Sequence, residues 1–314
     1  MPPSSAYRPA ISVVIPTLNA APWLATALDS ICAQTLTNIE IIVIDNSSED
    51  DTPRILRQYA ACDSRLRIIT RSNNGIVGAL NEGLRAARGH FIARMNADDE
   101  AAPTRLAQQL ERFTADPGLV ALGSAVTLMD AAGNSVQSCP RPTQHADIEH
   151  GLLAGDVGAM IHPSVMFRAT ALMTVTGYRP SAANLENLDL FLRIARVGAL
   201  ANLPEALLRH RVQASNNYLA QKAGLHAQKL GILREAHLAR GLSLDPSRIT
   251  ENSTFGDPAA QAREWAASSL AFGSRRVAVN HGLRAVRLQP SCRASWRALR
   301  CALTAPLTKP GSTC

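Results

Sequence analysis

The sequence is poor in aromatic residues and contains no long apolar stretch. Only 4% of its 314 residues are aromatic, so rings alone do not build a surface for stacking sugars or bases. No apolar run approaches the ~18–20 residues that a membrane-spanning helix needs. The first residues lack the basic segment followed by an apolar one that marks a secretory signal. These absences lead us to expect a cytosolic protein.

The chain also lacks the usual sequence motifs of cysteine-ligated metal sites and of phosphate-binding loops. None of its six cysteines follows CxxC spacing, and without an export signal we expect free thiols. A P-loop would require GxxxxGK[ST], which is absent, and the loop after the first apolar run, TLNAAP, contains no glycine for a dinucleotide fingerprint. A nucleotide bound by this chain would therefore need a metal ion to neutralise its phosphates.

Positive charge is concentrated in the last third of the chain. Residues 1–220 carry 18 arginines and 20 acidic residues, a net charge of −2, whereas residues 221–314 carry 14 basic and 5 acidic residues, a net of +9. These two values account for the formal charge of +7. A basic tail favours a polyanion or an anionic membrane surface as partner. A solvated helical face rich in arginine explains the same charge equally well.

Short apolar runs alternate with amphipathic segments along the first part of the chain. The apolar runs predict buried strands at 11–15, 39–45, 66–70 and 90–95. The segments that follow them predict helices over 23–34, 52–61, 76–89 and 102–113. This alternation is typical of right-handed βαβ units around a parallel sheet, whose ligand sits beyond the carboxyl ends of the strands.

Acidic residues follow two of the predicted strands. Asp45 ends the second strand, and Asn96, Asp98 and Asp99 follow the fourth. Several carboxylates at one rim repel one another unless a cation or a donor-rich ligand lies between them. Hard oxygen ligands of this kind suit Mg²⁺ or Mn²⁺. The structural alternatives are a cap or turn role for Asp45 and a helix start for the adjacent aspartates.

Two segments together resemble a known family: ISVVIPTLNAAPWLATALDSICAQTLTNIEIIVIDNSSEDDT and RSNNGIVGALNEGLRAARGHFIARMNADDEAAPTRLAQQ. They are similar to the family 2 inverting nucleotide-sugar glycosyltransferases of the A-type fold, and a looser similarity continues to about residue 216. The resemblance implies an α/β fold with a Rossmann-like, mostly parallel sheet. It further implies a catalytic domain over 1–216, with a nucleotide-sugar half at about 11–100 and an acceptor-side half at about 101–216, followed by a basic helical extension over 217–314.

The resemblance assigns the donor site residue by residue. Asp45 would accept a hydrogen bond from the base, and Asp98 would ligate Mn²⁺ or Mg²⁺ on the sugar diphosphate. Asn96 stands where the family's motif begins with aspartate, so it contributes no charge, and Asp99 would steady the loop. Arg211 would contact the diphosphate. The full set of nucleotide-sugar-binding residues is Pro16, Thr17, Asn19, Asp45, Arg71, Asn74, Gly75, Asn96, Ala97, Asp98 and Arg211.

The general base is less clear, because the family's usual aspartate is Asn187 in this chain. Three interpretations stay open: Glu186 is the base, Asp189 is the base, or transfer is impaired. Arg193 lies four residues after Asp189 and would pair with it on a helix, which favours a bracing role for that acid. His162 is placed near the diphosphate by the resemblance, although a structural histidine before proline fits the sequence as well.

These expectations define an enzyme that transfers a sugar from a nucleoside-diphosphate donor, most simply a UDP-sugar, to an acceptor hydroxyl with inversion. Cell-surface polysaccharide or glycoconjugate synthesis in a bacterium is the expected setting, with a glycan or lipid-linked acceptor. The extension over 221–314 would contact the inner face of the cell membrane, or would simply cap the catalytic domain. The alternative function is a catalytically impaired binding or scaffold module. No nucleic-acid motif is present, so no specific nucleic acid is expected as a partner.

Overall fold

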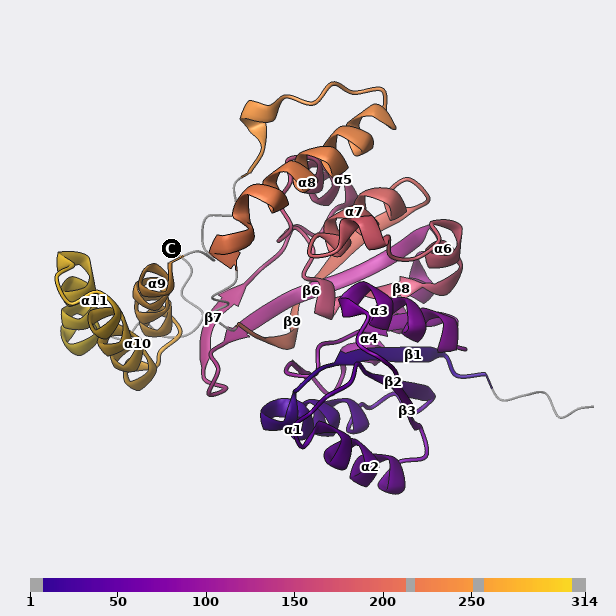
Figure 1. Ribbon diagram of the computed structural model, residues 1–314, viewed down its shortest axis with the longest axis horizontal. Coiled ribbons are helices and arrows are strands. Elements are labelled where there is room, and N and C mark those ends of the chain that lie inside the picture. The colour runs from indigo at the N-terminus through magenta and orange to yellow at the C-terminus, as the bar shows by residue number, and fades with distance from the viewer. Residues whose placement is uncertain (1–7, 213–217, 251–256, 307–314) are drawn as a thin grey trace, which may run out of the picture. The chain divides into compact units, whose positions relative to one another are not determined.

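The structure is a computed structural model that describes residues 8–212, 218–250 and 257–306 (Figure 1). Contacts within the chain divide it into two compact units. The first consists of Met1–Ala125, Pro140–Leu208 and Leu225–Thr250. The second consists of Val126–Cys139, Arg209–Gly224 and Glu251–Cys314. The expected division at residue 216 stays a prediction, and the contacts group the chain differently because a hairpin from within 1–216 packs with the C-terminal helices.

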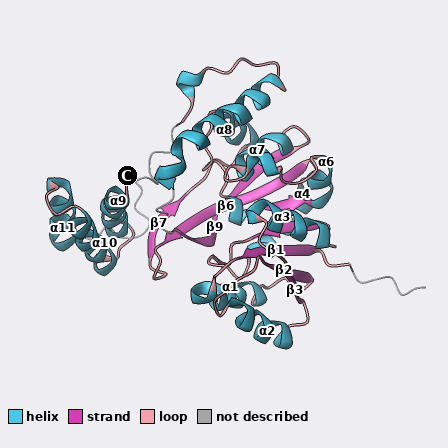
Figure 2. Ribbon diagram, viewed as in Figure 1, coloured by secondary structure: helices cyan, strands magenta, loops and turns pink. Residues whose placement is uncertain are grey.

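Strands and helices alternate through the first 115 residues, as the apolar runs predict (Figure 2). Their order is β1 (Ile11–Thr17), α1 (Ala21–Cys32), β2 (Ile39–Asp45), α2 (Thr52–Cys62), β3 (Leu66–Thr70), α3 (Gly75–Ala86), β4 (Phe91–Arg94), β5 (Glu100–Ala101) and α4 (Arg105–Ala115). The remaining elements up to residue 211 are β6 (Leu119–Met129), β7 (Ser135–Cys139), α5 (His145–Leu153), η1 (His162–Ser164), β8 (Met166–Arg168), α6 (Ala169–Thr174), η2 (Pro180–Ala182), α7 (Glu186–Ile194) and β9 (Ala199–Arg211).

The sheet is ordered β3-β2-β1-β4-β8-β6-β9-β5, and β7 pairs with β6. The four N-terminal strands are parallel, with β1 between β2 and β4. Strands β8 and β6 continue the sheet by antiparallel pairing. The parallel N-terminal half and the helical C-terminal region confirm the expected α/β fold class.

The N-terminal sheet is covered on both faces, which is why its strands are continuous apolar runs rather than alternating ones. Every residue of β1 and β2 is buried. Helix α3 packs on these two strands so closely that a Cβ added to Gly83 would collide with Val14 and lie 3.0 Å from Ile44 Cδ1. The glycine therefore sets the distance between α3 and the sheet, and with it the position of the loop that leads into α3.

The second unit has a small core of its own. The end of β6 and β7 form an antiparallel hairpin, and the helices are α9 (Pro258–Ala271), α10 (Arg275–Leu288) and α11 (Arg293–Thr304). Val136, Val212, Trp265 and Val277 form the buried cluster. The breaks between these helices fall at Gly273 and at Gln289–Pro290, as expected from the sequence.

In the sequence, helix α8 (Tyr218–Leu238) and the short helix η3 (Pro246–Arg248) follow β9 and precede α9. In the first unit, Leu233 and Ala236 of α8 join the main core, and Arg240 pairs with Glu149 of α5 at 2.8 Å. No helix within the described ranges combines the length and apolarity needed to cross a membrane. Cys314 lies outside the described residues, and the five cysteines that the structure describes are not joined in disulfides.

Candidate functional site

The carboxyl ends of β1, β2 and β4 lie side by side at one edge of the sheet. Thr17, the last residue of β1, is the register partner of Asp45, the last residue of β2. Strand β4 runs parallel to β1 on its other side, and the backbone N of Met95 donates to the carbonyl of Val14 at 3.2 Å. The loop after Asp45 and the loop at 96–99 therefore leave the same edge, with β1 between them.

The loops after β1 and β2 are tied to each other. Asn19 adopts a left-handed conformation with φ of 49°, and its backbone N donates to Ser48 Oγ at 2.9 Å. Its Oδ1 accepts from the backbone N of Glu49 at 2.9 Å. The buried Asp45 accepts at Oδ1 from the backbone N of Ser48 at 3.1 Å. Pro16, Thr17 and Asn19 thus lie against the loop of Asp45, as a shared pocket requires, although their contact with a nucleotide stays a prediction.

The loop before α3 borders the same edge. Gly75 begins α3 with φ of 69°, a conformation that disfavours any other residue. The backbone N of Asn74 donates to Asn46 Oδ1 at 3.2 Å, which joins this loop to the end of β2. Arg71 is bound to Glu82 at 3.1 Å and to the carbonyl of Gly78 at 2.9 Å. The predicted donor-site residues Arg71, Asn74 and Gly75 therefore belong to a loop that is held next to Asp45. The side chain of Asn46, which makes one of these bonds, was not among the predicted site residues.

Segment 96–99 carries the side-chain oxygens that the sequence predicts as ligands of a cation. Asn96 and Asp98 are half-buried, whereas Asp99 is fully buried, as a loop-steadying residue would be. Across residues 8–212, 218–250 and 257–306, no three His, Cys, Asp or Glu side chains form a metal-binding cluster. Mn²⁺ and Mg²⁺ commonly take only one or two protein carboxylates and complete their shell with phosphates and water. The half-buried carboxylate of Asp98 fits that kind of binding.

The two candidate bases lie on α7 in different surroundings. The buried carboxylate of Asp189 is bound by Arg193 at 2.6 Å and by Arg179 at 3.5 Å. Arg193 also donates to the carbonyls of Val175 and Gly177, so Asp189 braces the start of the helix. Glu186 is the first residue of α7, and its Oε2 is buried without a hydrogen-bond partner among the described residues. Glu186 is thus the less engaged of the two acids, and which of them is the base stays a prediction.

His162 is buried in an aromatic cluster. Its Nε2 lies 2.8 Å from Tyr178 Oη, and its ring packs edge-on against Tyr178, Phe167 and Phe191. Burial, together with the charge of Arg94, lowers the pKa of His162 well below its usual value. The ring is therefore neutral at pH 7 and has the contacts of a structural histidine; its expected position near the diphosphate stays a prediction.

Arg211 belongs to the second unit and forms hydrogen bonds within it. Its side chain is 6% exposed, and Nη1 donates to the carbonyls of Asp130 and Ala131, each at 3.0 Å. These bonds hold the turn of the β6–β7 hairpin. The structure therefore gives Arg211 a structural role, and its expected contact with a diphosphate stays a prediction.

Comparison with known families agrees with this geometry. Residues 12–173, which contain the strands and loops of the candidate site, match the model of the family described as "Glycosyl transferase family 2". The chain belongs to this family. It is a glycosyltransferase by that membership, and its resemblance to the family is confirmed.

Relatives of this glycosyltransferase are found in several bacteria. It is 32% identical to EpsE of Bacillus subtilis (strain 168) over 212 residues, which cover 65% of this chain and 73% of that protein. It is 27% identical to the chondroitin synthase of Escherichia coli over 230 residues, which cover 73% of this chain. The matched part is only 32% of that synthase, so the chain spans about a third of its length.

Solved structures share the fold of this glycosyltransferase. S. aureus TarS 1–349, crystallised in complex with UDP-GlcNAc, has a TM-score of 0.60 at 15% identity, covering 93% of this chain and 90% of that one. The mannosyltransferase PcManGT from Pyrobaculum calidifontis, in complex with GDP-Man and Mn²⁺, has a TM-score of 0.53 at 20% identity, covering 96% and 76%. At these identities the likeness establishes the fold.

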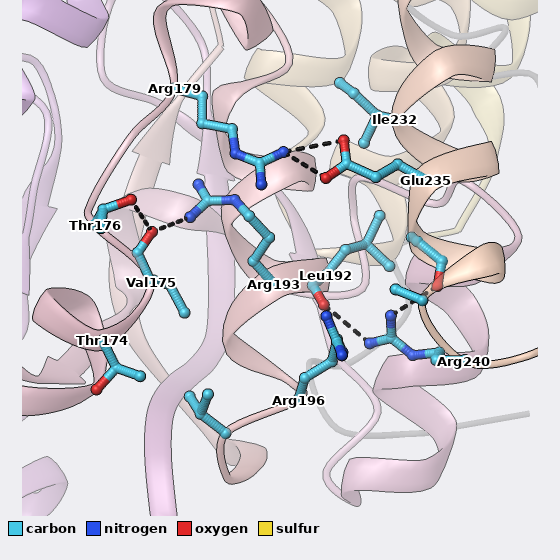
Figure 3. Close-up of a pocket in the computed structure, with 13 residues that line it drawn as sticks. Thr174, Val175, Thr176, Arg179, Leu192, Arg193, Arg196, Ile232, Glu235 and Arg240 are labelled. Carbon is cyan, nitrogen blue, oxygen red and sulfur yellow. Dashed lines mark hydrogen bonds and ion pairs between the residues drawn. The ribbon is translucent and has the colours of Figure 1, made fainter.

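A pocket of about 410 Å³ opens in the first unit of the glycosyltransferase, at the C-terminal end of α7. Figure 3 shows that its arginines are bound to neighbouring groups: Arg179 to Glu235, and Arg193 to the carbonyl of Val175. Arg196 and Arg240 also line it. None of the residues assigned to the donor or to the base lines this pocket, so it is not the predicted donor site.

Sequence reasoning missed one charged residue of the site, Arg94. It ends β4 with its side chain 7% exposed. Burial lowers the pKa of Arg94, while electrostatic interactions with Tyr178, Asp99, Glu186 and Asp98 act in the opposite direction. The only signal in the sequence is a basic residue at the end of an otherwise apolar strand, HFIARM.

Proposed function

We propose that this glycosyltransferase moves a sugar from a nucleoside-diphosphate donor to an acceptor hydroxyl, with inversion at the anomeric carbon. The observation that supports it best is the shared edge of the sheet from which the loop of Asp45 and the loop of Asp98 and Asp99 both leave. The first loop suits the base of a nucleotide and the second suits its phosphates through a cation, whereas Glu186 at the start of α7, whose Oε2 has no hydrogen-bond partner among the described residues, suits an acceptor hydroxyl. The donor complexes of the two structural neighbours are consistent with this division.

The residues act at the two ends of the transferred sugar. Asp45 holds the base of the nucleotide, with uracil as the simplest ligand. Asp98 holds Mn²⁺ or Mg²⁺, which supplies positive charge to the leaving diphosphate when bound. Glu186 accepts the proton of the acceptor hydroxyl at a carboxylate oxygen, from the face of the sugar opposite the diphosphate. Attack from that face inverts the anomeric carbon.

A thermal-shift screen of nucleotides and nucleotide sugars, with and without Mn²⁺, tests the donor part of the proposal. We expect a higher Tm with a nucleoside diphosphate and Mn²⁺ together, because a ligand that binds only the folded state stabilises it; at 100 times Kd the effect is about 2.7 kcal/mol. Donor hydrolysis or transfer should follow with the same nucleotide. If no nucleotide binds and no donor is consumed, the proposal is wrong.

A second function is favoured by the two amides at positions where the family has acids, Asn96 and Asn187. A glycosyltransferase-like chain with impaired catalysis would bind its nucleotide and serve as a binding or scaffold module. Nucleotide binding without measurable turnover over a wide range of donors and acceptors would favour it. The name of one relative, the chondroitin synthase, supports polysaccharide synthesis instead.

The C-terminal helices provide a surface for an anionic membrane, where a lipid-linked acceptor would be located. On α11, the exposed Arg293, Trp296, Arg300 and Leu303 follow a spacing of three, four and three residues, which places them on one face. An amphipathic face of this kind lies at a lipid interface, where each Arg adds about 1 kcal/mol. Arg275 is engaged differently, because it donates to the carbonyls of Ala302 and Ala305 at the end of α11.

Co-sedimentation with vesicles tests this surface. We expect binding to vesicles with an anionic lipid, loss of binding in high salt, and little binding to neutral vesicles. The double variant Trp296→Ala with Leu303→Ala should reduce the bound fraction, whereas Leu238→Ala, an exposed leucine outside these helices, should not. Equal binding of the wild type to neutral and anionic vesicles, or none to either, would reject the membrane contact.

A further inference from the structure

The pocket at the C-terminal end of α7 combines apolar side chains with arginines. Its lining comes from the end of α6 and the residues after it, from the end of α7 and from α8 (Figure 3). Among the apolar residues, Leu192 is 2% exposed and Ala236 is 7% exposed. The basic residues of the lining are Arg179, Arg193, Arg196 and Arg240. A cavity of about 410 Å³ with apolar residues and convergent polar groups has the size and composition of a small-molecule site.

Two of these arginines, Arg196 and Arg240, are brought to the same end of α7. Arg240 Nη2 donates to the carbonyl of Leu192 at 2.9 Å. Leu192 lies one turn before Arg196, and the last carbonyls of a helix point toward its C-terminal end. Figure 3 shows the side chain of Arg196 extending toward that of Arg240. Two guanidiniums in this arrangement favour an anion beside them, because like charges otherwise repel each other.

The arginines of the pocket carry more charge than the acids that pair with them. Arg240 is paired with Glu149 at 2.8 Å. The other acids paired with the pocket's arginines are Asp189 and Glu235. Four guanidiniums therefore face three carboxylates, which leaves a net charge of +1. The arginine without an acid is Arg196, whose exposed side chain has no hydrogen bond or ion pair among the residues that the structure describes.

The pocket also offers two hydroxyl groups as hydrogen-bond acceptors. Thr174 Oγ1 donates to the carbonyl of Thr170 at 3.0 Å, and Thr176 Oγ1 donates to the carbonyl of Val175 at 2.7 Å. Each hydroxyl has used its proton, so it can only accept from a ligand hydroxyl. Thr176 also has φ of 59°, a conformation that is unfavourable for a β-branched residue and that is found most often at ligand and active sites. Figure 3 shows these threonines on one side of the pocket and Arg240 on the other.

We propose that this pocket is a second ligand site, separate from the donor site, and that it binds a sugar phosphate. Arg196 and Arg240 bind the phosphate, because the N–H donors of a guanidinium match phosphate oxygens. Thr174 and Thr176 accept hydrogen bonds from hydroxyls of the sugar, and the apolar side chains cover its ring. The inference does not depend on the proposed function, since none of the residues assigned to the donor or to the base lines the pocket.

Titration calorimetry with glucose 1-phosphate tests this site. The titration is made in EDTA, which suppresses metal-dependent binding at the proposed donor site. We expect glucose 1-phosphate to bind at least about tenfold more tightly than glucuronate or inorganic phosphate, because neither of these supplies both the phosphate and the sugar. Arg196→Gln should weaken the binding of glucose 1-phosphate about tenfold, since it removes a hydrogen bond between two charged groups.

A change of charge at Ala239 provides a second test. Ala239 lines the pocket and is exposed, so its replacement does not disturb the core. Ala239→Glu should weaken the binding of glucose 1-phosphate at least as much as Arg196→Gln does, whereas Ala239→Lys should preserve or tighten it. The matched control is Arg57→Gln, which removes an exposed arginine of α2 in the same unit and should keep the affinity of the wild type.

Three results would overturn the site. They are a folded wild type that does not bind glucose 1-phosphate, an affinity that is unchanged in both Arg196→Gln and Ala239→Glu, and tighter binding of glucuronate than of glucose 1-phosphate. The proposed function is tested separately by UDP and Mn²⁺. A wild type that binds glucose 1-phosphate with the expected dependence on Arg196, but binds no nucleotide and consumes no donor, would support this site and reject the proposed function alone.

Discussion

Replacing Asp98 by alanine should abolish the metal-dependent part of nucleotide binding. In the wild type, removal of Mn²⁺ with a chelator should weaken UDP binding at least about 100-fold, because a divalent cation contributes several kcal/mol against phosphate charge. Asp98→Ala should bind UDP in the presence of Mn²⁺ only as weakly as the wild type does without it. The chelator should then cause no further loss of UDP affinity. Titration calorimetry with UDP, with and without Mn²⁺, measures both values.

Two further variants make this test specific to Asp98. Asp147→Ala removes an exposed aspartate of α5 and should keep the metal-dependent affinity of the wild type. Asn96→Asp adds the carboxylate that the family's motif has at this position and should tighten Mn²⁺ binding. Metal-dependent UDP binding that survives in Asp98→Ala would remove Asp98 from the metal site.

The N-terminal half of the fold could be predicted because its signals are local. A parallel strand covered on both faces must be apolar along its whole length. ISVVI and IEIIVID show this directly in the sequence, and the corresponding strands are fully buried. The carboxyl ends of such strands meet at one edge, so the convergence of Asp45 with segment 96–99 also followed from the sequence.

Arg94 and Arg211 show why the rest of the site could not be predicted. The sequence shows a basic residue at the end of a strand, but the charges that act on Arg94 include Glu186, which is 92 positions away along the chain. For Arg211 the resemblance predicts a contact with the diphosphate, and this contact stays a prediction. Arg211 also donates hydrogen bonds to the carbonyls of Asp130 and Ala131 in the turn of the β6–β7 hairpin. No local sequence pattern predicts that Arg211 lies beside this turn.

The packing of the C-terminal helices on the β6–β7 hairpin could not be predicted either, because it depends on residues that are distant in the sequence. The helices themselves could be expected from composition, and their breaks fall at Gly273 and Gln289–Pro290. Their packing on the β6–β7 hairpin depends on contacts such as His281 Nε2 with Asp130 Oδ2 at 3.2 Å and on the burial of Trp265. These contacts link residues more than 100 positions apart, so the sequence alone shows neither partner.

Glu186→Gln should mainly lower activity, whereas Asp189→Asn should mainly lower stability. Glutamine keeps the shape of Glu186 but cannot accept a proton, so we expect kcat to fall about 10²- to 10⁴-fold with little change in UDP affinity or Tm. Asparagine at 189 leaves Arg193 without its buried counter-charge, which costs about 3–5 kcal/mol and should lower Tm by several degrees. Steady-state transfer kinetics and thermal unfolding of the two variants distinguish these outcomes.

Glu205→Gln provides the matched control for the first variant, since Glu205 is an exposed glutamate of β9 in the same unit. It should keep the kcat and Tm of the wild type. A large loss of kcat in a stable Asp189→Asn protein, together with an active Glu186→Gln protein, would make Asp189 the base instead. That result would require the carboxylate now bound by Arg193 and Arg179 to be released when the acceptor binds, because a base held in two ion pairs has no oxygen ready to take the proton.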